Sequence, residues 1–473
     1  RSRQESPTPD KKCQWHLLNF VHGIGGPQTI GQRHLRPHDQ YPTNGQQKGT
    51  RMTTLDFDIL RAAVGGSHVA LRCRTELQPA GGVGDKVFPS TYGVSDGAPT
   101  RYATETYRED GVEKRSVLLD SVASSANRHE LALQEGLDAG EISFPNPFVD
   151  FTVDEELIEI GRITALQAPH RLADAIFRDS MLDGTLFRLS ELGHQITDAS
   201  PDAATALFLT NPVALLMGMW DSTGPKGGLG AKFQRAFVSE IVGLGAQFGV
   251  KVGSRIDPLQ IERSAATVYR HAEPDQGWTL DESEAQVDKK GPVAVGNKGD
   301  LGRPSAVNHG NVTPSIDHQA GGVTIEKAIQ TTVISLAALR KLRFCTDASG
   351  AALSGAARQR AELAARTAVA ALGVVAIAYQ RDYDYDLRSR CLLVPTHEAR
   401  LELVPRDGST PPVFPVDRAA AVALLEQAAA ECAAAGLAWP TEPIRLVPAP
   451  KLCELIKRSR AQSFQRPADD QAE

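Results

Sequence analysis

Hydrophobic and polar positions follow two rhythms along the chain, one typical of strands and the other typical of helices. Between residues 69 and 77 apolar and polar side chains alternate, which predicts a strand with one buried face. Short apolar runs predict further strands at residues 116–119, 157–166, 214–220 and 387–394. Apolar positions three or four residues apart predict helices at residues 120–137, 168–181 and 229–244. Ala-rich stretches predict two more helices at residues 350–372 and 416–435. No strict strand–helix–strand repeat emerges, so the expected fold class is α+β.

Residues 1–51 differ from the rest of the chain. They are rich in Gln, His, Pro and Gly, lack sustained periodicity and precede Met52. We expect an atypical N-terminal extension (a tag, a misplaced start or a disordered segment), then one domain over residues 52–465 and a tail at 466–473. The extension contains a cysteine and four histidines whose spacing superficially resembles that of metal ligands: Cys13, His16, His22, His34 and His38. No strand–turn–helix pattern surrounds them, so disorder is favoured over a zinc module.

Two loop-rich segments interrupt the predicted domain. Residues 79–111 contain short β-like pieces around 100–107, which predicts a protruding hairpin. Residues 278–322 are polar and rich in Gly and Pro, with no long periodic element. A stretch of that length inside a compact domain is usually functional or disordered. Both segments are expected to be insertions.

Composition narrows the function classes. With 473 residues and 41% hydrophobic content, the chain can bury a large core. A net charge of -6 counts against a free-standing nucleic-acid binder, which is usually basic, and leaves room for a local basic stripe. The six cysteines are widely separated, which argues against structural zinc and redox motifs. No apolar run reaches the roughly 18 residues of a membrane span, so we expect a soluble, cytoplasmic protein. We also expect no metal and no cofactor.

The glycine-rich stretch at residues 220–235 is the strongest candidate for chemistry. It carries Lys226 in the loop, and Lys232 and Arg235 in the helix predicted to follow. Loop amides, a helix N-terminus and cations together favour an anion, here a nucleic-acid phosphate. A nucleoside-triphosphatase loop is disfavoured because Leu229 stands where the second glycine of that motif belongs, and Phe233 follows Lys232.

The predicted helix at 120–137 offers a second phosphate site. Ser121, Ser125 and Arg128 project on one side, and Asn127 lies about a quarter turn away. Hydroxyls around an arginine near a helix start can hold phosphate oxygens. The alternative is a solvated face whose first turn is capped by an Asp-Ser pair.

Weaker candidates lie elsewhere. Arg255 occupies a turn, where an ion pair is the alternative, and Asn308 and His309 lie in the polar insertion. Arg388 and Arg390 alternate along a predicted strand, so they would share a face suited to a nucleic-acid backbone. No catalytic motif is present, and we assign no catalytic residue.

Several of these segments, in collinear order, resemble one family. The resemblance is carried by residues 120–128 (Asp-Ser-Val-Ala-Ser-Ser-Ala-Asn-Arg), 170–174, 220–224, 229–233, 254–258 (Ser-Arg-Ile-Asp-Pro), 308–310, 339–344 and 387–391. The family is the backbone subunit of the type I-G (formerly I-U) CRISPR Cascade, a RAMP protein of Cas family seven. The similarity runs from about residue 52 to about residue 460.

This resemblance implies a modified RNA-recognition-motif (ferredoxin-like) palm with finger and thumb insertions, supplied by residues 79–111 and 278–322. Family members polymerise along a guide RNA (crRNA), pair it with a target DNA strand, and work with other Cascade subunits and a helicase-nuclease, without a membrane. The candidate residues above would be RNA contacts, and the acidic balance is acceptable because only one face meets RNA. Aromatic residues make up only 6%, so phosphate contacts are expected rather than base stacking.

Three function classes remain open. The first is a non-enzymatic guide-RNA scaffold. The second is a RAMP-type endoribonuclease that processes guide RNA or cuts target RNA, for which the candidate residues are His129, His309, Asp85 and Asp96. The third is a phosphate-metabolite enzyme that uses the glycine loop, and the absent nucleotide motif argues against it.

Overall fold

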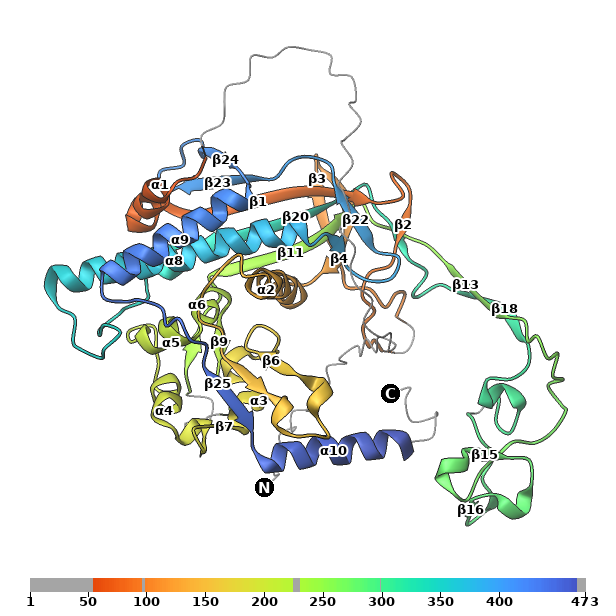
Figure 1. Ribbon diagram of the computed structural model, residues 1–473. Helices are drawn as coiled ribbons and strands as arrows, with labels where there is room; N and C mark the ends of the chain where they lie inside the picture. Colours follow the sequence, from red (N-terminus) through yellow and green to blue (C-terminus); the bar gives the residue numbers. More distant parts are fainter. Residues whose placement is uncertain (1–53, 96–97, 224–229, 298, 466–473) are drawn as a thin grey trace, which may run out of the picture. The chain divides into compact units, whose positions relative to one another are not determined.

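The computed structural model describes residues 54–95, 98–223, 230–297 and 299–465 (Figure 1). The chain divides into two units, Arg1–Arg51 and Met52–Glu473, and every described residue belongs to the second. The predictions for the N-terminal extension, for Lys226 and Asp96, and for the tail lie outside the described residues.

A nine-stranded antiparallel sheet forms the centre of the described unit. Its main order is β21-β22-β1-β20-β11-β4-β3, with β23 also beside β1 and β24 beyond β23. The strands are β1 (His68–Pro79), β3 (Thr104–Glu109), β4 (Val112–Asp120), β11 (Phe237–Leu244), β20 (Lys327–Ser335), β21 (Tyr385–Asp386), β22 (Leu392–Pro395), β23 (Arg400–Pro405) and β24 (Val413–Pro415).

The chain reaches the middle of this sheet by a split strand–helix–strand path. After β1 it forms the β3–β4 hairpin and helix α2 (Val122–Asp138). The described residues between 139 and 236 then form most of a second sheet and several short helices before the chain enters β11. Because β20 pairs antiparallel with both β1 and β11, those two strands run parallel to each other with β20 between them. Helix α8 (Gly355–Asp382) follows β20 and leads to β22 and β23 on the far side of β1.

Helices cover one face of the sheet. The helix α2 packs against α8 and β11, and α9 (Arg418–Ala434) packs on α8 (Figure 1). Leu71, Cys73 and Leu77 of β1 are buried, whereas Arg74 is exposed, so alternate side chains point to opposite faces. The polar positions of β1 therefore lie on the face without helices.

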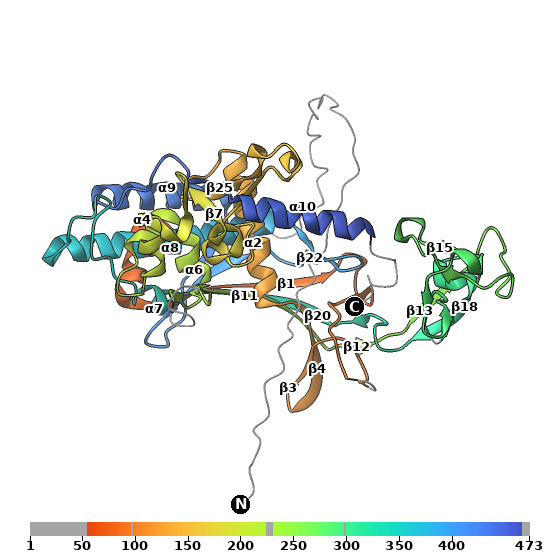
Figure 2. The same ribbon diagram turned by 90° about the horizontal axis from the view of Figure 1, so that it is seen from below.

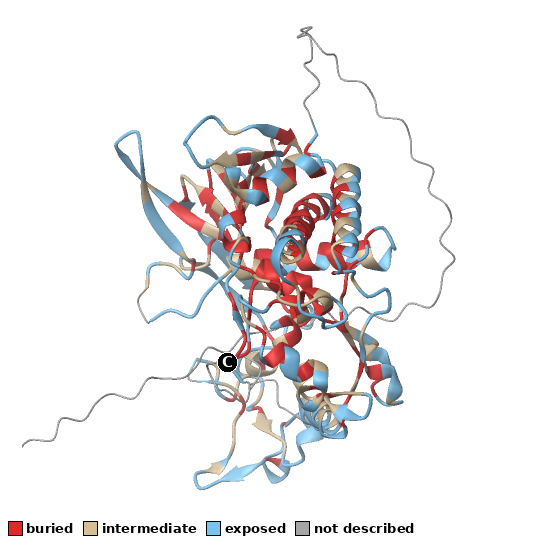
Figure 3. Ribbon diagram, turned by 90° about the vertical axis from the view of Figure 1, so that its left-hand side faces the viewer, coloured by how far each residue is buried: buried red, intermediate tan, exposed pale blue. Residues whose placement is uncertain are grey.

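Helix α8 is the main apolar element of the core, and the central helices carry many of the buried positions (Figure 3). It is the one helix among the described residues that is long and apolar enough to cross a membrane, and 89% of its most apolar window is buried inside the fold. At Gly373 an added Cβ would lie 2.7 Å from Ile334 Cδ1, so glycine permits the close approach of α8 to β20.

A second, five-stranded sheet lies beside the first and shares one continuous hydrophobic core with it. Its order is β6-β5-β25-β7-β8, and β25 runs parallel to β5 but antiparallel to β7. Its strands are β5 (Phe148–Asp150), β6 (Arg162–Thr164), β7 (Ser180–Leu182), β8 (Thr185–Leu186) and β25 (Arg445–Pro448). Along the chain, helix α3 (Ala175–Arg178) precedes β7 and helix α10 (Pro450–Gln465) follows β25.

An arm extends from the end of β11. Its stem is a two-stranded ribbon, β13 (Lys251–Arg255) with β18 (Val312–Asp317), whose side chains are exposed on both faces apart from the half-buried Arg255 and Asp317. The described residues between 256 and 311 form a small lobe beyond it (Figure 2). The arm includes most of the polar insertion expected at 278–322, but it begins earlier.

The remaining α-helices and β-strands are short. They are α1 (Phe57–Ala62), α4 (Glu191–Thr197), α5 (Thr205–Thr210), α6 (Pro212–Met217), α7 (Leu336–Leu339), β2 (Lys86–Val87), β9 (Met219–Trp220), β10 (Lys232–Phe233), β12 (Gln247–Phe248), β14 (Tyr269–Arg270), β15 (Trp278–Thr279), β16 (Val287–Asp288), β17 (Gly291–Pro292) and β19 (Val323–Thr324).

The α+β class is confirmed, as are the strands at 69–77 and 116–119 and the helices at 120–137 and 416–435. The helix at 350–372 is also confirmed, although α8 continues ten residues further, to 382. The hairpin predicted within residues 79–111 is partly right: β3 and β4 form it, over residues 104–120. Its two-residue turn, Asp110 and Gly111, has positive φ at both positions, as type I′ turns require.

The predicted helix at 229–244 is wrong, because the chain forms β10 and β11 there. In β11 the buried positions Phe237, Ser239, Ile241 and Gly243 alternate with more exposed ones, which is strand periodicity. The spacing of Lys232, Arg235 and Ser239 only imitated a helix.

Three further predictions are wrong. Residues 214–220 are mostly helix α6, because Asn211 caps the helix and Pro212 occupies its first turn. Residues 168–181 hold a turn, α3 and the start of β7 instead of one helix. The strand expected at 387–394 begins only at Leu392. The strand predicted at 157–166 is partly right, since β6 covers only residues 162–164.

Candidate nucleic-acid interface

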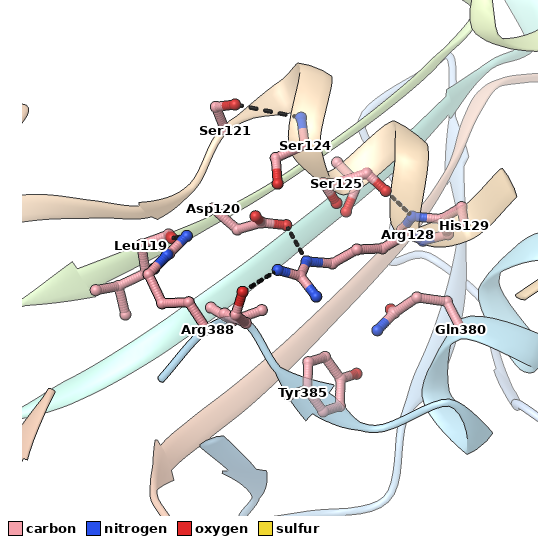
Figure 4. Close-up of polar contacts among 12 residues, drawn as sticks. Leu119, Asp120, Ser121, Ser124, Ser125, Arg128, His129, Gln380, Tyr385 and Arg388 are labelled. Atoms are coloured by element: carbon pink, nitrogen blue, oxygen red, sulfur yellow. Dashed lines mark hydrogen bonds and ion pairs between the residues drawn. The ribbon is translucent and has the colours of Figure 1, made fainter. Parts of the chain in front are cut away.

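The head of α2 is held by a buried charge network (Figure 4). Asp120 ends β4 with its side chain fully buried, and Arg128 Nε lies 3.3 Å from Asp120 Oδ2. Arg128 also donates to the carbonyl oxygens of Asp386, at 3.1 Å, and Leu387. Arg388 donates to the carbonyl oxygen of Leu119 at 2.7 Å. Two arginines predicted to contact RNA are thus occupied in joining α2 and β4 to the turn after β21.

Electrostatics at this network favour a structural role for Arg128. Burial raises the pKa of Asp120, and the nearby Arg128 guanidinium opposes that rise. The side chain of Arg128 is only 21% exposed. A buried carboxylate needs a compensating cation, so Arg128 is committed to Asp120 before any phosphate arrives.

Of the three other residues predicted at the start of α2, one caps the helix, one is buried and one is exposed. Ser121 is the N-cap, and its hydroxyl accepts a hydrogen bond from Ser124 N at 3.3 Å. Ser125 is buried, whereas Asn127 is exposed. The capping alternative therefore describes Ser121, and Asn127 is the member of the predicted set that presents its side chain most openly.

His129, one of the ribonuclease candidates, lies inside the fold. Its Nδ1 is 2.6 Å from the carbonyl oxygen of Ser125, and its ring meets the Phe237 ring edge-on at 4.8 Å. Burial lowers the pKa of His129 to about 4. A substrate cannot reach this imidazole without opening the core.

Next to His129, Glu130 and Arg171 form a buried ion pair that sequence reasoning missed. Arg171 Nε lies 2.6 Å from Glu130 Oε1, and Arg171 Nη2 lies 3.0 Å from Oε2. Arg171 Nη1 also donates to the carbonyl oxygen of Gly218 at 2.9 Å. The pair therefore joins α2 to the chain that leads into the glycine-rich stretch. The sequence signal was the charged His170-Arg171 motif within an otherwise apolar segment.

Lys232 and Arg235 are both exposed, although they lie on and after β10 instead of on a helix. Lys232 Nζ stands 5.1 Å from the ring centre of Trp220, a tryptophan that is 52% exposed. Before the glycine-rich segment, Arg188 contacts Asp221 Oδ1 at 2.5 Å and Thr223 Oγ1 at 3.1 Å. These contacts fix one end of that segment beside an exposed aromatic–cation pair.

In the arm, the structure brings together Arg255, Asn308 and His309 from opposite ends of the lobe. Arg255 donates twice to the carbonyl oxygen of Gly310, at 2.7 and 3.1 Å. Asn308 is exposed and adopts a left-handed conformation, with φ of 62°. His309 lies with its ring centre 6.2 Å from that of Trp278. Arg255 therefore braces the junction between stem and lobe.

Arg388 and Arg390 do not share a face of a strand, so that prediction is wrong. Both lie in the turn before β22, where Arg390 has a φ of 59°. Arg388 points inward to Leu119, whereas the guanidinium of Arg390 lies 4.3 Å from the centre of the Phe88 ring. Only Arg390 remains on the surface.

Residues 71–248, from β1 to β12, match the family model described as CRISPR-associated protein GSU0053. The match supports the conclusion that this chain is a CRISPR-associated protein. It supports a role in CRISPR defence, and it covers α2 and the residues around the glycine-rich stretch. No curated protein matches the chain. Among the described residues, no group of three or more His, Cys, Asp or Glu side chains is arranged for a metal ion.

Proposed function

We propose that this CRISPR-associated chain is the guide-RNA-binding backbone subunit of a type I-G Cascade, a RAMP protein of Cas family seven. Several copies polymerise along a crRNA in the cytoplasm and present it for pairing with a target DNA strand. They act with other Cascade subunits and a helicase-nuclease, and without a membrane. The observation that carries the proposal is the split strand–helix–strand path within and beyond the matched residues.

The topology agrees with a ferredoxin-like palm. In such a palm the four strands run antiparallel, the first and third in sequence lie in the middle, and two helices cover one face. Here β1 and β20 are central, β11 and the β22–β23 edge flank them, and α2 and α8 supply the two helices. The strand β4 adds to this arrangement beside β11. The likeness supports an RNA-recognition-motif palm.

The two extensions suit the finger and thumb. The β3–β4 hairpin projects from the sheet on the side away from the helices (Figure 2), and the arm begins near Lys251. In the arm stem, Val252 pairs with Ile316, and they are 65% and 59% exposed. A two-stranded ribbon is marginally stable alone in water. Contact with a neighbouring copy or with RNA would bury this apolar pair.

The endoribonuclease alternative gains no support from the positions of its candidate residues. His129 is buried, and Asp85 lies in an exposed turn where its carboxylate accepts from Lys86 N at 2.9 Å. His309 lies near Trp278 at the junction of stem and lobe. These three side chains lie in separate elements, whereas general acid–base catalysis needs groups within reach of one substrate.

Co-expression of the full chain with a CRISPR array tests the proposal directly. The purified protein should carry RNA of guide length whose sequences derive from the array. Recovery of random cellular RNA, or of none, would contradict a guide-binding role. Incubation with repeat RNA, with and without magnesium, tests the alternative, because cleavage would make the chain an enzyme.

Removing the cations beside the glycine-rich stretch should weaken RNA binding. With Lys232→Ala and Arg235→Ala combined, we expect lower affinity for every RNA sequence and a shallower dependence on salt, by about 0.7 in slope for each lost phosphate contact. Fluorescence anisotropy with a labelled single-stranded RNA over a range of salt concentrations measures both. A suitable control is Arg445→Ala with Arg458→Ala, which removes two exposed arginines from β25 and α10. Equal affinity and slope in the two double variants would exclude this site.

A further inference from the structure

The face of the large sheet opposite the helices carries a hollow that the residues discussed above do not use. Its volume is about 730 Å³, within the roughly 300–1,000 Å³ typical of ligand sites. Its lining includes Arg74 and Glu76 of β1, Lys327 of β20, His397, and Arg400 of β23. Because α2 and α8 cover the other face, this hollow is distinct from the head of α2.

An interruption between β22 and β23, the two strands that pair with the same side of β1, shapes the hollow. The strand β22 pairs with the end of β1 as far as Pro395; β23 begins at Arg400, and its pairing with β1 starts at Leu401. The four residues between them leave the ladder, held by a hydrogen bond of 3.0 Å from Thr396 N to the carbonyl oxygen of Glu76. This excursion presents His397 and Glu398, both exposed, at the rim. Irregularities in strand pairing are often found next to functional sites.

Three of the four glutamates that line the hollow already have cationic partners. Glu402 Oε2 lies 2.5 Å from Arg72 Nη2. Glu76 Oε2 lies 3.6 Å from Lys327 Nζ. Glu109, on the β3–β4 hairpin, lies 2.9 Å from Lys114 Nζ. The fourth glutamate, Glu398, lies at the exposed rim. The pairing therefore accounts for most of the negative charge in the hollow.

The two arginines that line the hollow, Arg74 and Arg400, have no carboxylate partner among the described residues. Cys73 pairs with Leu401, so the next positions in the antiparallel register place Arg74 opposite Arg400 on the same face. Both are exposed, and among the described residues neither guanidinium makes a hydrogen bond or an ion pair. Like charges at directly opposed positions are destabilising. An anion between them would remove that cost.

We propose that Arg74 and Arg400 bind a phosphodiester group of a nucleic-acid strand in this hollow. The inference rests on the proposed function and adds a contact on the face of the palm remote from α2. Guanidinium groups match phosphate oxygens in planar, bidentate pairs. Because the hollow offers one pair of arginines without a carboxylate partner among the described residues, the site suits one phosphate instead of a length of strand. That phosphate belongs either to the guide RNA or to the target DNA strand.

The test compares Arg74→Ala with Arg400→Ala combined, against the Arg445→Ala with Arg458→Ala control, which removes the same charge elsewhere. Anisotropy titrations use a labelled single-stranded RNA and a DNA of the same sequence, with the purified full chain. We expect the hollow variant to bind one of the two strands about tenfold more weakly. Its salt slope should be shallower by about 0.7, as for one phosphate on a single strand. The strand that responds identifies the source of the phosphate.

The outcomes separate this inference from the proposed function. If the unmodified chain binds RNA and the hollow variant matches the control for both strands, the hollow is not a phosphate site and the proposed function stands. If the unmodified chain binds neither strand, the proposed function fails and this inference fails with it. Arg74→Gln with Arg400→Gln keeps the polar side chains and should reproduce the loss, which guards against a local folding defect.

Discussion

Arg171→Met is expected to destabilise the fold by about 3–5 kcal/mol, the range for removing one member of a buried ion pair. The side chains of Arg171 and Glu130 are 9% and 2% exposed, and the guanidinium also holds the carbonyl oxygen of Gly218. Methionine fills much of the space but leaves the Glu130 carboxylate without a cation. Urea unfolding followed by circular dichroism measures the loss.

A surface ion pair provides the control for this variant. Arg162 pairs with Asp138, and their side chains are 56% and 49% exposed. Arg162→Ala should therefore change the free energy of unfolding by less than about 1 kcal/mol. Similar losses for Arg171→Met and Arg162→Ala would show that burial of the Glu130 pair contributes little.

The effect of Arg171→Met should also depend on pH. Burial raises the pKa of Glu130, and Arg171 opposes that rise. Without Arg171 the native state retains a proton that the unfolded state releases above its pKa of about 4.3. The unfolded state then binds fewer protons, so the stability of the variant falls as pH rises. The variant should be closer to the unmodified chain at pH 5 than at pH 8.

Arg128→Ala is expected to cost about 2–4 kcal/mol, since it removes the cation beside buried Asp120 and two hydrogen bonds to backbone carbonyls. Thermal or urea unfolding of the full chain measures this. The exposed neighbour Asn127 supplies the comparison on the same helix. Asn127→Ala should leave stability within about 0.5 kcal/mol and, under the proposed function, weaken RNA binding.

The variants Arg128→Ala and Asn127→Ala together distinguish two possible roles of Arg128. If Arg128→Ala leaves stability unchanged and lowers RNA affinity, Arg128 serves chiefly as the phosphate contact predicted from sequence. If it lowers stability while the folded protein binds RNA normally, its role is to anchor α2. The buried position of Asp120 favours the second result.

The sequence predicted the long, strongly periodic elements well. The strand β1 and the helix α2 have a clear period and a buried face, which are the conditions under which pattern reasoning succeeds. The helices α8 and α9 were found from long Ala-rich stretches, since alanine has the highest helix propensity. It failed over residues 229–244. There, cations three or four positions apart gave an apparent helix, although apolar residues alternate from Phe237 onward.

The candidate site shows a different limit. Sequence reasoning found Arg128 and Arg388 as chemically significant arginines, but it could not determine whether they face solvent or a buried carboxylate. That depends on Asp120, whose burial results from the packing of β4 against β11 and of α2 against α8. The Arg74 and Arg400 pair was also beyond reach, because these residues lie more than 300 positions apart and meet only through strand register.

The position of β25 in the second sheet has a consequence for biosynthesis. This strand lies between β5 and β7, yet Arg445 to Pro448 are made long after the strands on either side. While the ribosome is still translating the preceding residues, β5 and β7 expose unpaired backbone edges, and such edges invite association with other chains. The nascent protein therefore keeps these two edges unpaired until β25 emerges from the ribosome.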